Sequence, residues 1–233
     1  MAVASAVEIV DLASVPLREV NQRLHELGDD SPRRWRVLNP NGAHAVACGV
    51  DAEVDIEIVG HVGYYCAGMN KLASVRVLGN AGTGVAENMM SGSVVVEGNA
   101  SQSAGASAHG GLLVVHGDAA ARCGISMKGV DIVVRGSVGH LSGFMAQTGA
   151  LVVCGGAGDS LGDSIYETRI YVRGEVAGLG ADCVEKELRE EHVTQVRSVL
   201  ERAGIDDVDP GGFRRYGSAR QLYNFHIDNV GAY

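Results

Sequence analysis

The sequence predicts an all-β protein built on a single-stranded right-handed β-helix, a solenoid of about seven coils with N- and C-terminal helical caps. Three observations support this prediction. The first two are that a glycine recurs every 19 residues and that aliphatic side chains stand two and four positions before it. The third is composition, because 33 glycines with only 5% aromatic residues are typical of tight, repeated turns.

The recurring glycine ends each apolar run of the repeat. It stands at Gly60, Gly79, Gly98, Gly117, Gly136, Gly155 and Gly174. We interpret these residues as structural corner glycines that supply the backbone angles a corner needs. A second column of small residues indicates another corner or a close approach of the chain. It comprises Ala67, Ala86, Gly105, Gly124, Gly143 and Gly162.

Strands are expected before the corner glycines. The aliphatic residues two and four positions before each glycine alternate with period two, and most of them are β-branched, as in a strand. A 19-residue unit is too short for a helical-hairpin repeat of about 33 to 45 residues. It fits one coil of a β-helix, so we expect both positions to point inward and to stack from coil to coil.

The position three before each glycine faces outward in such a coil. It is charged in the first coils and then holds four valines, Val95, Val114, Val133 and Val152. An exposed apolar stripe marks an interface, unless the chain's own terminal helix covers it. We expect all four valines to be buried, and the two covers stay open as alternatives.

The chain ends are expected to cap the solenoid, because an open coil exposes unpaired strand edges. The predicted parts are an N-terminal strand-helix-strand cap (1–50), the β-helix domain (51–183), a capping helix (184–205) and an irregular docking tail (206–233). Helical spacing places the first helix at 16–27 and the second at 184–203, each followed by a glycine. The aromatic, basic tail is expected to dock on its own chain or on a partner.

Composition argues against several classes of protein. The formal net charge is −9 and Lys and Arg form no run, which disfavours nucleic acid or an anionic membrane as partner. The five cysteines include no C-x-x-C pair, which predicts reduced thiols in a cytoplasmic protein. The start of the chain lacks the basic region of a signal peptide. No apolar stretch has the length of a membrane helix.

The sequence contains no convincing catalytic constellation. The histidines in or near the coils have no ligand spacing, and the G-x-S-x-G motif is absent. One polar column also repeats every 19 residues: Lys71, Met90, His109, Lys128, Gln147 and Tyr166. It has no carboxylate, so it predicts a recognition face. We therefore expect no catalytic, cofactor-binding or metal-binding residue, and a partner-facing surface formed by this column and the four outer valines.

The stretch from Gly60 to Gly174 resembles a known family. Its segments "GHVGYYCAGMNK", "GTGVAENMMSG", "GNASQSAGASAHGG" and "GDSIYETRIYVRGEV" are similar to the Gly-x-Gly-x-Gly β-helix domain. That domain forms the C-terminal part of the large subunit of glutamate synthase and also occurs in one of the subunits of formylmethanofuran dehydrogenase. As a free-standing chain, the sequence most resembles the B subunits of N-methylglutamate synthases, glutamate-synthase-like proteins.

The resemblance implies a non-catalytic scaffold subunit of a multi-subunit, cytoplasmic enzyme that converts glutamate and methylamine into N-methylglutamate and ammonia. Its expected partners are an amidotransferase-like subunit and an FMN-containing synthase subunit, which would carry the FMN and an iron–sulfur cluster. Two alternatives belong to the same class: the β-helix subunit of an ammonia-assimilating glutamate synthase, and that of formylmethanofuran dehydrogenase. Two belong to other classes: an autonomous β-helix enzyme acting on sugars or acyl groups, and a free-standing binding module.

Overall fold

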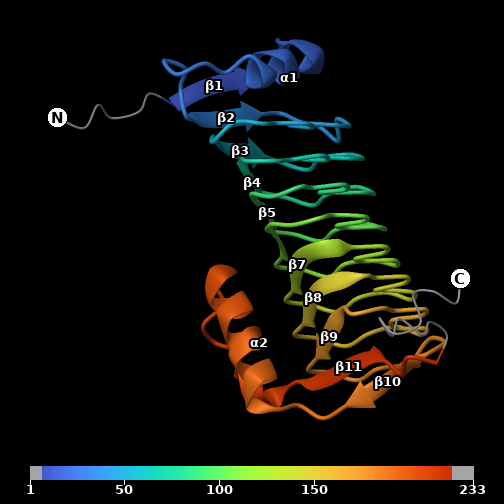
Figure 1. Ribbon diagram of the computed structural model, residues 1–233. Coiled ribbons are helices and arrows are strands. Elements are labelled where there is room, and N and C mark those ends of the chain that lie inside the picture. Colours follow the sequence, from blue (N-terminus) through green and yellow to red (C-terminus); the bar gives the residue numbers. More distant parts are fainter. Residues whose placement is uncertain (1–6, 222–233) are drawn as a thin grey trace, which may run out of the picture.

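A computed structural model describes residues 7–221 and shows a solenoid of stacked parallel coils (Figure 1). The strands form one sheet in the order β1-β2-β3-β4-β5-β6-β7-β8-β9-β11-β10. The elements are β1 (Val7–Asp11), α1 (Leu17–His25), β2 (Arg34–Leu38), β3 (Asp55–Val59), β4 (Ser74–Val77), β5 (Ser93–Val96), β6 (Leu112–Val115), β7 (Lys128–Val134), β8 (Thr148–Val153), β9 (Arg169–Val172), β10 (Cys183–Lys186), α2 (Glu190–Arg202), η1 (Pro210–Gly212) and β11 (Arg214–Ser218). The predicted all-β solenoid is confirmed.

The core consists of the aliphatic columns that repeat every 19 residues. Residues two and four positions before each corner glycine are at most 1% exposed. They stack in parallel register, so that Val96 lies beside Val77 and Val115 beside Val96. The residues two positions after the glycines form a second ladder of single bridges from coil to coil. The inward orientation of the aliphatic columns is therefore confirmed.

The corner glycines are needed for close approach rather than for their backbone angle. Of the seven, Gly60 alone has a left-handed φ, +130°, so the prediction that the column supplies unusual backbone angles is wrong at the other six. A Cβ on Gly117 would lie 2.2 Å from Asn99 Oδ1 and 2.8 Å from the Gly98 carbonyl oxygen. Successive coils approach so closely here that a side chain has no room.

The residues after the first five corner glycines form a ladder of side-chain hydrogen bonds. The amide of Asn99 donates to Asn80 Oδ1, and the amide of Asp118 donates to Asn99 Oδ1, both at 2.8 Å. The ladder starts at the His61 Nδ1 atom, which accepts from the Asn80 amide at 2.9 Å. A short side chain that ends in an acceptor can reach the amide one coil further on, which accounts for the polar residues at this corner.

The second column of small residues lies in a turn arm of alternating backbone handedness. Its six members have φ between +52° and +70°, and the residues two positions before and after them are left-handed as well. As a result, the Gly105 amide donates back to Val85 O at 2.9 Å, whereas the Ser107 amide donates forward to Ile125 O at 2.8 Å. Bonds in both directions offset the cost of about 1–2 kcal/mol for each non-glycine residue in this conformation.

Helix α1 covers the first coil at its turn arm. Val20 and Leu24 are buried in the core. Between them, the Asn21 side chain donates to Ala45 O at 2.8 Å and accepts from the Ala47 amide at 3.0 Å. These two bonds replace those that a preceding coil would make, so the helix satisfies an otherwise open edge. The observed helix lies within the predicted range of 16–27.

Strands β10 and β11 cover the last coil, and helix α2 runs along the side of the sheet (Figure 1). The helix predicted over 184–203 begins only at Glu190, because residues 183–186 form β10 and pair antiparallel with β11. Strand β11 belongs to the predicted tail and inserts between β9 and β10, so this part of the tail docks on its own chain. Residues 222–233, the rest of the tail, lie outside the described residues. In the described part of the chain, neither helix has the length and apolar character needed to span a membrane.

Candidate functional site

Two of the four outer valines, Val133 and Val152, lie beneath helix α2. Val114, Val133 and Val152 are at most 1% exposed, and the last two pack into a cluster with the apolar side chains of α2. Val95 lies beyond the helix and is only half-buried. The chain's own helix therefore covers Val133 and Val152, so these two do not face a partner. The expectation that all four valines are buried is wrong at Val95.

The polar column keeps the arrangement expected from its spacing. The amides of His109 and Lys128 donate to the preceding coil at 2.7 Å, and the other members make the equivalent bond. All the side chains of the column are exposed except that of Tyr166, which is half-buried. Lys71 forms an ion pair with Asp51 at 2.7 Å. That this face contacts a partner stays a prediction.

Apolar side chains flank the column at its N-terminal end. Met90, a member of the column, is 48% exposed, and Met69 and Leu72, on either side of Lys71 in the sequence, are 56% and 45% exposed. Tyr64 and Tyr65, in the same coil, are also about half exposed. Methionine and tyrosine are enriched at protein interfaces, where lysine is depleted from the buried centre. Exposed side chains of these types therefore fit the middle of a contact surface, and Lys71 fits its rim.

The column ends at a polar cleft near the C-terminal end of the solenoid. Tyr166 contributes to the wall of this cleft, which has a volume of about 810 Å³. The remaining walls come from the start of β8, the start of β9, strands β10 and β11, and the first turns of α2. The chain has three lysines: two stand in the column, and the third, Lys186, lines the cleft.

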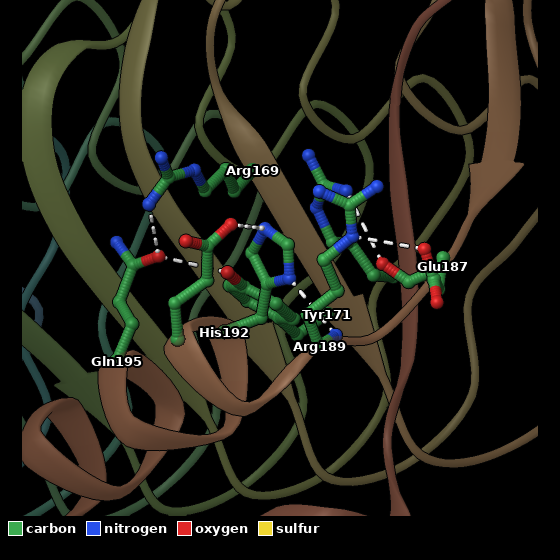
Figure 2. A network of polar contacts seen from close by, with 8 residues as sticks. Arg169, Tyr171, Glu187, Arg189, His192 and Gln195 are labelled. Atoms are coloured by element: carbon green, nitrogen blue, oxygen red, sulfur yellow. Dashed lines mark hydrogen bonds and ion pairs between the residues drawn. The ribbon is translucent and has the colours of Figure 1, made fainter.

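Figure 2 shows the polar network that joins α2 to the sheet at this cleft. Gln195 Oε1 accepts hydrogen bonds from Arg169 Nη1 and from the Tyr171 hydroxyl, both at 2.8 Å. Burial raises the pKa of Tyr171, so this hydroxyl stays a donor. Arg189 Nε pairs with Glu187 Oε2 at 2.8 Å, just before the helix begins.

His192 is a second buried titratable group of this network, beside Tyr171. It is 3% exposed, and its Nδ1 accepts a hydrogen bond from the Arg189 amide at 3.0 Å. Burial, followed by the charge of Arg215, lowers the pKa of His192 below its usual value of 6.5, although Glu191 acts in the opposite direction. The ring is therefore neutral at pH 7, with Nδ1 free to accept and Nε2 carrying the proton.

Comparison with known proteins places the chain in a family. No family model matches it. The chain is 59% identical over 226 residues to "Protein GlxC" of Rhizobium meliloti (strain 1021), an alignment that spans 97% of this chain and 99% of the relative. This chain belongs to the GlxC family. The match spans nearly the whole of both proteins, so it is not confined to the part of the chain that holds the column or the cleft.

Apart from Tyr166, the cleft residues of this GlxC family member carry no recognisable motif. The cleft is assembled from four segments, 148–149, 166–169, 186–195 and 215–220, and no fixed spacing connects them. The one available signal was the density of charge in "VEKELREEH" and "FRRYGSAR". Such runs also occur on ordinary solvated helices and tails, so charge alone does not indicate a cleft.

The cysteines and acidic groups of the described residues form no metal centre. Within this part of the chain, no three His, Cys, Asp or Glu side chains are grouped so that they could hold a metal ion. All five cysteines are free thiols. Burial raises the pKa of Cys66 and of Cys123 to about 12, so both remain protonated at neutral pH and serve as small core residues.

Proposed function

We propose that this chain is a non-catalytic scaffold subunit of a multi-subunit glutamate-synthase-like enzyme, and specifically of N-methylglutamate synthase. The observation that supports it is the uninterrupted stack of inner columns, buried from the first coil to the last, within the stretch Gly60–Gly174 that resembles the β-helix domain of glutamate synthase. A parallel stack with a packed interior makes a stiff body. Such a body suits the task of holding neighbouring subunits in fixed relation.

The proposed complex contains two further subunits. One is amidotransferase-like, and the other is a synthase chain that carries FMN and an iron–sulfur cluster, as the resemblance implies. The complex would convert glutamate and methylamine into N-methylglutamate and ammonia. In this arrangement the present chain catalyses no step of the reaction, and its contribution is measured as assembly of the complex rather than as turnover.

We assign the contact with the synthase chain to the polar column and its apolar flank. Two of the three lysines of the chain stand in this column. Its second member, Met90, is exposed, as are Met69 and Leu72, which are close to Lys71 in the sequence. An apolar centre with charged residues around it is the usual anatomy of a specific interface. The opposite charge is therefore expected on the synthase surface that faces Lys71 and Lys128.

A charge reversal in the column tests this assignment. The double variant Lys71→Glu/Lys128→Glu should bind the synthase subunit about tenfold more weakly or worse, because like charges then face each other across the interface. The measurement is co-purification of the tagged chain with its flavin-containing partner, followed by titration of the isolated subunits. The variant should keep its β-sheet circular dichroism, because both side chains are exposed.

A matched control changes the same net charge on other surfaces. Arg18 and Arg197 are exposed residues on α1 and α2, and Arg18→Glu/Arg197→Glu should leave assembly unchanged. Equal binding of the synthase subunit by both double variants would show that the column is not part of the interface. Turnover by the isolated chain on sugars or acyl groups, or failure to recover any flavin-containing partner, would contradict the scaffold proposal itself. Assembly into a complex that uses ammonia instead of methylamine would favour the ammonia-assimilating alternative.

A further inference from the structure

The polar cleft concentrates positive charge in an acidic protein. Its walls carry five cationic side chains, those of Arg169, Lys186, Arg189, Arg215 and Arg220. They carry three carboxylates, those of Glu167, Glu187 and Glu191. The chain as a whole has a formal net charge of −9. The cleft is therefore a local reversal of the charge of the molecule, and such reversals raise the local concentration of anions.

Three of the five cations have no carboxylate partner within the described residues. Arg189 and Arg220 form ion pairs, with Glu187 and Glu167 respectively. Arg169, by contrast, donates to the neutral amide of Gln195. Arg215 Nη1 reaches only a main-chain carbonyl oxygen, at 3.3 Å. For Lys186, the same part of the chain provides no ion pair and no hydrogen bond to the ammonium group.

Two buried polar atoms in the same walls also lack a partner within the described part of the chain. They are the hydroxyl oxygen of Thr168, a residue that is 2% exposed, and Nε of Arg215. Native proteins leave few buried polar groups unpaired, and each exception requires an explanation. An acceptor supplied from outside the chain would satisfy Nε of Arg215 and could also accept from the Thr168 hydroxyl.

We propose that this cleft binds a small dianion that presents oxygen atoms, either a dicarboxylate or a phosphate group. Guanidinium groups match both ligands, because their planar donors pair with two oxygens at once. The cleft volume of about 810 Å³ falls within the range of small-molecule sites, about 300 to 1,000 Å³. The proposal does not depend on assembly with other subunits, since all the residues named belong to this chain.

Calorimetric titration of the purified full chain tests the proposal. The probes are sodium succinate, sodium phosphate and sodium chloride, each at the same ionic strength. We expect saturable binding of succinate or of phosphate, with a raised melting temperature, and no saturable signal with chloride. Saturation by succinate alone identifies a dicarboxylate site, and saturation by phosphate alone identifies a phosphate site. Identical responses to all three salts would overturn the proposal.

Substitutions in the cleft locate the binding. Arg215→Gln should weaken binding by about tenfold, because it removes an unpaired charge and a fork of donors. Lys186→Gln should weaken it as well, and it provides the test if Arg215→Gln fails to fold. The matched control is Arg76→Gln, which removes an exposed arginine on β4, where Arg76 pairs with Glu97. Unaltered affinity in Lys186→Gln, or equal loss in the control, would overturn the assignment to this cleft.

Discussion

The outer face of the sheet differs between its two halves, although the strands and their register are continuous. Over β2 to β4 the outward position holds Arg36, Glu57 and Arg76, and Arg36 pairs with Glu57 across neighbouring strands at 2.6 Å. Over β7 and β8 the same position holds valines that α2 covers. The inner columns are equally buried in both halves. The fold is thus set by the inner columns, whereas the outer column decides what the face contacts.

Helix α2 is held over the valines by polar contacts at both of its ends. Arg202, at its C-terminal end, forms an ion pair with Asp131 of β7. Gln195, nearer its start, receives the hydrogen bonds from Arg169 and Tyr171 of β9. Apolar burial supplies most of the free energy and the polar contacts fix the position of the helix, because exposed ion pairs contribute only about 0–1 kcal/mol.

The largest effect is expected where the two halves are alike, in the inner column. Val115→Asp places a carboxylate at a position that is 0% exposed and stacks on aliphatic side chains above and below. A buried, unpaired charge costs several kcal/mol, so the variant should fail to fold or should melt far below the wild type. Far-UV circular dichroism and thermal unfolding measure this.

The control adds the same charge without burying it. Gln102 is exposed on a turn arm, and Gln102→Asp should change the free energy of unfolding by less than about 0.5 kcal/mol. A cooperative, wild-type-like transition for Val115→Asp would mean that the inner column is not the common basis of the two halves.

A smaller but still large effect should separate the halves directly. Val133→Arg puts an arginine under α2, where the wild-type side chain is 0% exposed, and should cost about 3 kcal/mol or more as the helix is displaced. Val95→Arg makes the same change in the same column, beyond the helix and one coil from Arg76. It should cost less than about 0.5 kcal/mol. Urea denaturation of both variants gives the two changes in the free energy of unfolding. Equal losses of stability would mean that the outer positions of the two halves do not differ in their environment.

The sequence predicts the inner columns well because their cause repeats. Each aliphatic residue stacks on its counterpart 19 positions away, so every coil needs aliphatic residues at the same two inward positions. The corner glycines show the limit of this reasoning. Their spacing is a property of the sequence, but six of the seven are required by the backbone of the preceding coil. The close contact with this backbone becomes visible only in the structure, where the coils are stacked.

The candidate site was predictable in part, for the same reason. The polar column repeats with the coil and could be found, whereas the cleft joins residues such as Glu167 and Arg220, which pair across 53 positions. Strand β10 also escaped prediction, because its pairing with β11 is antiparallel and does not repeat. Contacts that occur once leave no period in the sequence, so they become visible only in the structure.

The smallest expected effect is a pH dependence of the free energy of unfolding, and it arises in the covered half, the part of the sheet that α2 covers. Because the pKa of His192 is lowered in the folded protein, the unfolded chain takes up the proton first as the pH falls through about 6.5. The stability that the neutral ring provides is complete above that pH and declines below it. Protonation would also turn the Nδ1 acceptor into a donor facing the Arg189 amide. The free energy of unfolding should therefore fall between about pH 7.5 and about pH 5.5.

His192→Asn separates this contribution from those of the other histidines. Asparagine retains an acceptor for the Arg189 amide but does not titrate in this range, so the variant should lose less stability than the wild type between the two pH values. Hydrogen exchange should show that the extra loss in the wild type is concentrated in α2, while β3 to β5 stay protected. Equal losses in the two proteins would mean that His192 is as easily charged in the folded chain as in the unfolded one. Loss of protection in β3 to β5 would place the sensitive group outside the covered half.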